Sequence, residues 1–154
     1  MVVGFLDDMI LLAHPIGASL LLYWFYRQYK WKMKRIENPD LFTLENHVKN
    51  GRLLAKFATI VVAIAFAANV YNAHIHQQSL LQGLTPNSLH GWTGPLGLVL
   101  LWCMVLWGES ALKQKENGES YQHSKSKHSR AADFIIAVMA IHAFLGFLYV
   151  FVII

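Results

Sequence analysis

The chain has 154 residues, of which 55% are hydrophobic and only 14% charged, and its mean hydropathy is +0.36. Soluble domains carry about 25% charged residues, so this composition argues against a soluble domain and favours an integral membrane protein. The net charge is +4, and its basic residues flank apolar segments, which favours contact with lipid head groups over nucleic acid.

Four apolar stretches are long enough to cross a hydrocarbon layer of about 30 Å as helices. In chain order they are Met9 to Tyr26, Leu53 to Tyr71, Trp92 to Trp107, and Phe134 to Ile154. Together they use nearly the whole chain. We therefore expect an all-α fold, an integral membrane four-helix bundle, as a single domain over residues 1–154.

The basic residues predict the orientation of these spans. All 13 Lys and Arg residues lie in Arg27 to Lys56 or in Lys113 to Arg130, whereas Asn72 to Leu89 contains none. Four spans place both basic stretches on one side of the membrane, and the positive-inside rule assigns that side to the cytoplasm, stroma or matrix. Both termini are then expected on the opposite, lumenal side of a thylakoid or inner membrane.

Four histidines fall into two pairs when they are placed by membrane depth. His14, early in the first span, and His90, at the start of the third, belong to the outer half. His47 and His128 precede the second and fourth spans and belong to the inner boundary. Each of the four has Gly or Ala four residues later, on the same helix face, where the missing side chain would leave room for a flat macrocycle.

The inner pair requires helices that begin before their apolar runs. Asp40, after Pro39, can cap a helix starting near Leu41, and a second helix is expected to start near Ser126. The stretch from Lys113 to Arg130 is polar and is otherwise expected to form a flexible loop.

Paired histidines favour haem over zinc. A structural zinc site needs four ligands, commonly including cysteine, and this chain has one Cys. A b-type haem needs only two axial imidazoles, which facing helices of a bundle can supply. The alternative is that these histidines are hydrogen-bonding groups at helix ends near the membrane surface.

Two short motifs resemble those of the cytochrome b-561 family. Asn87 to Gly97, NSLHGWTGPLG, resembles that family's Ser-Leu-His-Ser-Trp-x-Gly signature, and Ala13 to Ile16, AHPI, resembles its His-Pro motif. The chain is closer still to a small four-helix family of cyanobacteria and plastids that looks like a trimmed b-561 core. The resemblance implies two haems b, with His14 paired to His90 and His47 paired to His128.

These patterns lead to a functional hypothesis with one alternative. We expect transmembrane electron transfer through two bis-histidine b-type haems stacked across the bilayer, as an electron-transfer oxidoreductase or a cytochrome subunit. The alternative is a structural or assembly subunit of a larger respiratory or photosynthetic membrane complex, with at most one non-transferring haem. The electron donor and acceptor stay open, with a quinone or a larger complex as candidates.

Further residues are candidates for contact with the haems. Gly51 and Gly94 would give the rings access, Trp92 is the tryptophan best placed to touch a ring, and Arg52 and Arg130, with Lys49, could neutralise propionates. His142, with Gly146 four residues later, lies deeper in the last span. For it we weigh a hydrogen-bonded packing role against a role as an alternative ligand, a quinone-binding group or a support for the ligands.

Overall fold

The protein is almost entirely helical. The structure, a computed structural model, describes the backbone of residues 2–153 and the side chains of residues 13–31 and 33–149. Helices account for 85% of the chain, and the described residues form no strand. The helices are α1 (Val2–Tyr29), α2 (Trp31–Glu37), α3 (Leu44–Ile75), α4 (Leu80–Leu84), α5 (Leu89–Glu116) and α6 (Gln122–Ile153).

Three of the expected membrane spans are confirmed as helices of suitable length and composition. They are Leu44–Ile75, Leu89–Glu116 and Gln122–Tyr149. The protein therefore has the elements of a multi-pass membrane protein. The first expected span, Met9 to Tyr26, lies within α1, but the side chains before Ala13 lie outside the described residues, so this span stays a prediction.

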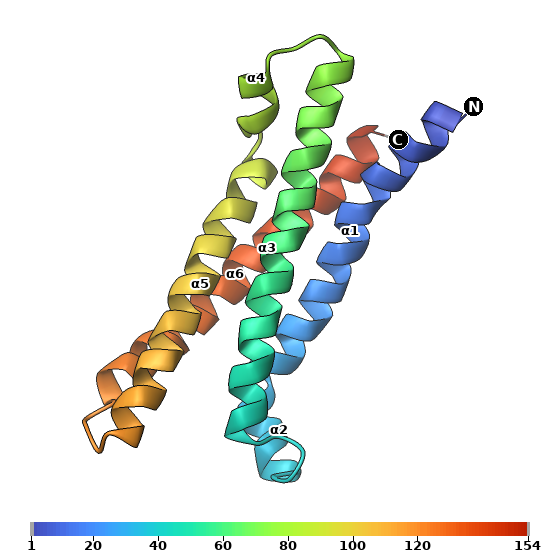
Figure 1. Cartoon of the computed structure of the whole chain (residues 1–154). Coiled ribbons are helices and arrows are strands. Elements are labelled where there is room, and N and C mark those ends of the chain that lie inside the picture. The colour runs from blue at the N-terminus through green and yellow to red at the C-terminus, as the bar shows by residue number, and fades with distance from the viewer. Residues whose placement is uncertain (1, 154) are drawn as a thin grey trace.

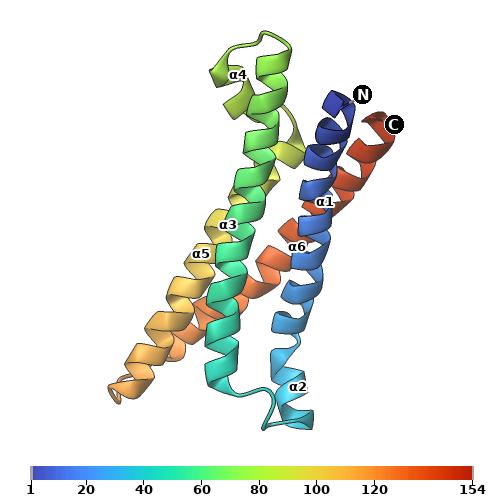
Figure 2. The same ribbon diagram turned by 45° about the vertical axis from the view of Figure 1, so that its right-hand side comes forward.

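Each long helix packs mainly against the next long helix of the chain. The most extensive contact joins α5 and α6, followed by α1 with α3 and α3 with α5. Figure 1 shows the start of α1 and the end of α6 at the same end of the molecule as α4, with α2 and the turn between α5 and α6 at the opposite end. After a turn of the view, α6 is seen to begin beside the end of α5 and to approach the start of α1 (Figure 2).

Apolar packing holds the helices together towards the end that carries α2. Leu54 and Ile135 are the largest side chains that are almost completely buried. Small residues of α3 let the neighbouring helices approach closely, because Ala55 and Ala58 are buried in the same cluster as Leu101 and Met104. Many large apolar side chains point outward instead, as a lipid environment allows; Ile60, Val99 and Phe144 are more than half exposed.

The expected start of the helix that carries His47 is wrong. The helix carrying His47 begins at Leu44 rather than near Leu41, because Thr43, not Asp40, is its N-cap. Thr43 has an extended backbone, and its hydroxyl accepts a hydrogen bond from the Asn46 backbone N–H at 3.2 Å.

The flexible loop expected from Lys113 to Arg130 is also wrong, since only residues 117–121 separate α5 from α6. Gly118 ends α5 with a φ of +73°, and the Glu119 N–H returns to the Gln114 carbonyl at 2.8 Å. The polar residues on both sides of this turn are helical, and most are exposed, although Ser124 is buried. Helix capping, rather than polarity, therefore decides where this connection begins.

Candidate functional site

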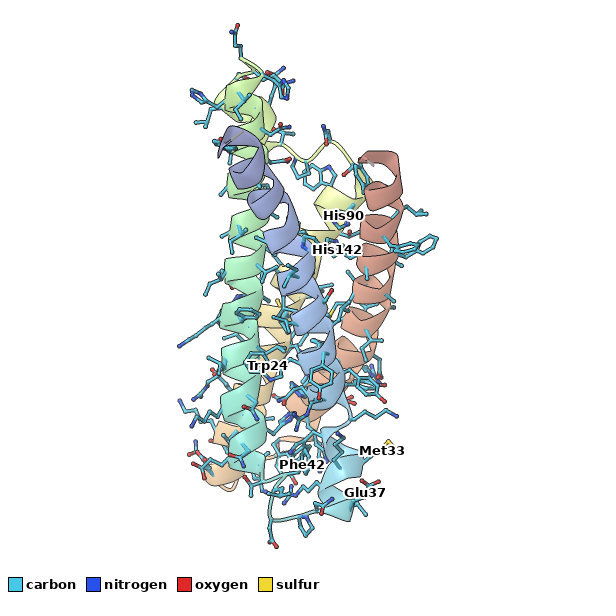
Figure 3. The ribbon with its side chains drawn as sticks, turned by 90° about the vertical axis from the view of Figure 1, so that its right-hand side faces the viewer. Trp24, Met33, Glu37, Phe42, His90 and His142 are labelled. Carbon is cyan, nitrogen blue, oxygen red and sulfur yellow. The ribbon has the colours of Figure 1, made fainter. Side chains whose placement is uncertain are left out.

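Three histidines from three helices converge in the half of the molecule nearer the termini. They are His14 of α1, His90 of α5 and His142 of α6, and one ring nitrogen of each lies within 4.8 Å of a ring nitrogen of each of the others. We call these three residues the outer cluster. The centroid of the His14 ring lies 6.0 Å from that of His90 and 6.3 Å from that of His142. Figure 3 shows the labelled His90 and His142 at neighbouring positions.

Hydrogen bonds determine which nitrogen carries the proton in two of these rings. His90 Nδ1 lies 3.0 Å from the His142 carbonyl oxygen, which can only accept, so Nδ1 carries the hydrogen. The Thr93 hydroxyl donates its one hydrogen to the His90 carbonyl at 3.0 Å. It must therefore accept from His142 Nδ1, which lies 2.9 Å away. In both rings the Nε2 lone pair stays available to a metal.

His14 adds a buried nitrogen that has no hydrogen-bond partner. Its Nδ1 is shielded from solvent, and no partner among the described residues meets it with hydrogen-bond geometry, although the Val61 backbone is near enough to interact with the ring. Buried polar atoms are nearly always paired in proteins, so a small shift of this ring towards the Val61 backbone, or a bound ligand, would satisfy the nitrogen.

Glycines on opposing helices make room for the outer imidazoles. A Cβ at Gly94 would lie 3.3 Å from His142 Cε1, and a Cβ at Gly146 would lie only 2.8 Å from His90 Cε1. Gly94 comes four residues after His90 but faces His142. Gly146 comes four residues after His142 but faces His90. The protein atoms that occupy the space beside these two glycines are thus imidazole atoms of the neighbouring helix.

The second pair of histidines lies near the other end of the molecule. His47, in the first turns of α3, and His128 of α6 have ring centroids 6.0 Å apart and ring planes at 81°. We call them the inner pair. His128 Nδ1 donates to the Met104 carbonyl at 2.9 Å, which leaves its Nε2 lone pair free. Gly108 makes room for this ring, since a Cβ there would lie 2.9 Å from His128 Nδ1.

Gln28 holds His47 in a different way. Its Nε2 donates to the His47 carbonyl at 2.6 Å and lies 3.0 Å from His47 Nδ1. Because that amide nitrogen is a donor, His47 Nδ1 accepts and Nε2 carries the proton in the neutral ring. Metal binding through Nε2 of His47 would therefore require Gln28 to turn its amide. The Trp31 ring packs against the His47 ring, with centroids 4.4 Å apart.

Both rings of the inner pair line a cavity of about 640 Å³. This volume falls within the range of about 300 to 1,000 Å³ that is usual for small-molecule and cofactor sites. Gly51, Gly108 and Ala132 are among the small residues of its wall.

Four cationic side chains also line this cavity: Arg35, Arg52, Lys115 and Lys125. Arg52 Nε forms an ion pair with Glu109 Oε1 at 2.6 Å. At the same end, the Tyr29 hydroxyl donates to Asp133 Oδ1 at 3.0 Å, and this bond raises the pKa of Tyr29, so the phenol stays neutral.

The other sequence candidates occupy different places. Arg130 and Lys49 are exposed and do not line this cavity, whereas Arg52 does. Trp92 is 59% exposed. A Cβ at Gly51 would meet the side chain of Gln28 at 3.4 Å, so this glycine accommodates the amide that contacts His47.

Several residues of these sites were not found by sequence reasoning. Thr93 and Gln28 orient the imidazoles of His142 and His47, and Gly108 accommodates that of His128. Thr93 carries a weak local signal, because it lies three residues after His90 on the same helix face. Gln28 and Gly108 have no such signal, because no histidine lies three or four residues from either of them in the chain.

The geometry at both places suits a metal held between two imidazoles. A ring atom lies about 1.15 Å from the centroid when ring bonds are about 1.35 Å, close to other conjugated C–N bonds. With a metal–nitrogen distance of about 2 Å, two opposed imidazoles have centroids about 6.3 Å apart. The observed separations of 6.0 Å for His14 with His90 and for the inner pair lie close to this value.

Comparisons with protein-family models, curated protein sequences and solved structures found no match to this chain.

Proposed function

We propose that this chain is a four-helix transmembrane electron carrier that holds two b-type haems, one at the inner pair and one at the outer cluster. The observation that carries the proposal is the repeated spacing of paired imidazoles from different helices, 6.0 Å between centroids in both places. Four different long helices contribute these four rings, which is how a bundle places axial ligands on both faces of a haem. Haem supplies the one-electron iron chemistry when bound.

The inner site has the strongest structural support. Its cavity of about 640 Å³ adjoins both rings and has mainly apolar walls. Four cations line the same cavity, and Arg35, Lys115 and Lys125 have no ion-pair partner among the described residues. They can pair with the two propionates of a haem through charge-assisted hydrogen bonds. A tetrahedral zinc ion would need two more ligands than the two imidazoles provide.

The chain's own residues prepare one ligand at each site. The Met104 and His142 carbonyls accept from the Nδ1 of His128 and His90, which orients each ring and raises the basicity of its Nε2. The positive side chains that line the inner cavity would favour the reduced form of a haem held there, since that form carries one positive charge fewer. These residues thus set ligand orientation and redox potential.

The helix arrangement supports the proposed membrane orientation. The two stretches that carry all 13 Lys and Arg residues lie at one end of the molecule, and the termini approach the other (Figure 1). We place the basic end on the cytoplasmic, stromal or matrix side. The inner pair then lies near that side and the outer cluster near the opposite one, as an electron path across a bilayer requires.

Haem content and difference spectra of purified protein test the proposal. Chain expressed with excess haem should bind two haems, seen by pyridine haemochrome assay and as two components in a dithionite titration. His47→Ala and His128→Ala should each remove the same component and leave the other in place. His76→Ala is the matched control, because His76 is exposed and lies at the end of α3, away from both sites.

Two outcomes would contradict this assignment. Protein without bound haem would overturn electron transfer and favour the structural subunit. Loss of different components on substitution of His47 and of His128 would show that the two rings do not share an iron.

A further inference from the structure

In the outer cluster, His142 lies at a distance from His14 that would suit the second ligand of a shared metal. Its ring centroid lies 6.3 Å from that of His14, almost the same separation as the 6.0 Å between His14 and His90. Its ring plane is at 89° to that of His14, and the His90 plane is at 77°. By distance and angle, either ring can face His14 across one metal atom.

The two rings opposite His14 cannot both bind one metal atom. His90 and His142 are stacked, with centroids 4.1 Å apart and planes tilted by only 15°. A metal bound to an imidazole lies close to the plane of that ring, about 2 Å from the nitrogen. A metal shared by both rings would have to lie where their two planes meet. With this separation and tilt, the planes meet only roughly 15 Å away, which is too far. The outer cluster therefore offers two alternative pairs of ligands rather than one set of three.

Hydrogen bonding leaves both rings ready for this role. His90 Nδ1–H donates to the His142 carbonyl, and His142 Nδ1–H donates to Thr93, so each ring presents a free Nε2 lone pair. Exchange between them would need no proton transfer and no electron transfer, because one iron–nitrogen bond would break as the other formed and both rings would keep the hydrogen on Nδ1. Gly146 and Gly94 provide the space in which the two rings lie.

We propose that His142 is a reserve axial ligand, so that the outer haem is held by His14 together with either His90 or His142. This inference rests on the proposed haem function. It assigns to His142 a role that packing alone would not require, and it makes the outer site tolerant to the loss of one ligand. His14 has no such substitute among the described residues, since it is the single ring on its side of the cluster.

Substitution of each ligand and of both together tests the proposal. His90→Asn is the best single variant, because its amide can still donate to the His142 carbonyl but cannot replace Nε2. We expect this variant to keep most of the outer haem with an altered low-spin ferric electron paramagnetic resonance spectrum. The double variant His90→Asn/His142→Ala, and His14→Ala, should lose the outer haem and keep the inner component, which reports that the protein is folded.

The outcomes separate the two proposals. If His90→Asn loses the outer haem as completely as the double variant does, the reserve role of His142 is overturned while the two-haem function stands. If wild-type protein has no outer component, the proposed outer haem and the ligand exchange are overturned together. If His142→Ala alone removes the outer haem while His90→Asn leaves the spectrum unchanged, His142 is the sole ligand and exchange is overturned.

Discussion

Gly108→Ala should remove the inner haem with little effect on the fold. The new Cβ would lie 2.9 Å from His128 Nδ1 and 3.1 Å from its Cε1. Comfortable contact needs about 3.5 Å, so the ring must move by about 0.6 Å. A ligand constellation tolerates misplacement of only about 0.5 Å, so this shift is enough to spoil the opposition of the two inner imidazoles.

The effect of this substitution on stability is the balance of two terms. Alanine in a helix interior is favoured over glycine by about 1 kcal/mol. Overpacking costs about 1 to 3 kcal/mol, and His128 can also lose its hydrogen bond to Met104, worth about 1 kcal/mol. The net change in the free energy of unfolding of the apoprotein should therefore be a destabilisation of at most about 3 kcal/mol.

Gly97→Ala is the matched control, because it changes the same residue type in the same helix. Its Cβ would lie at an ordinary distance of 3.6 Å from Val138 Cγ1. We expect Gly97→Ala to keep both haem components, and Gly108→Ala to lose the inner component, by about tenfold or more in haem affinity. The measurements are haem content and redox titration, with unfolding of both apoproteins in denaturing detergent. An inner component of wild-type content and potential in Gly108→Ala would refute the reasoning.

Three further changes probe the inner site, a helix end and the topology. Gln28→Glu adds a negative charge and a hydrogen-bond acceptor beside His47 Nδ1. This change should lower the midpoint potential of the inner component in a redox titration. An unchanged or higher potential would contradict the role given to Gln28. Gln77→Gly should stabilise the end of α3 by about 1 kcal/mol, because residue 77 has a φ of +55°; detergent unfolding no later than in wild type would count against this. For the topology, the native cysteine is replaced and a single cysteine is introduced at Ser120 or at Gln78, which are both exposed. The two cysteines should react with an impermeant maleimide from opposite sides of sealed vesicles. Reaction of both from the same side would contradict the proposed topology.

Local sequence was a good guide to the long helices but a poor one to their ends. Apolar length alone identified three segments that the structure confirms as helices able to span a membrane. The ends depend on single hydrogen bonds, so Thr43 displaced Asp40 as the cap of α3, and a glycine turn at Gly118 reduced an expected long loop to five residues, 117–121.

The sequence by itself determined which histidines lie at similar depth, since helix rise fixes height along the chain. From this it indicated both pairs, His14 with His90 and His47 with His128, which the structure brings to 6.0 Å between ring centroids. Only the tertiary structure decided how these rings are surrounded. Rotation of each helix about its axis, and the choice of neighbour, place Gly108 against His128 and stack His142 on His90. These contacts join residues far apart in the chain, and no local pattern encodes them, because they depend on how whole helices pack.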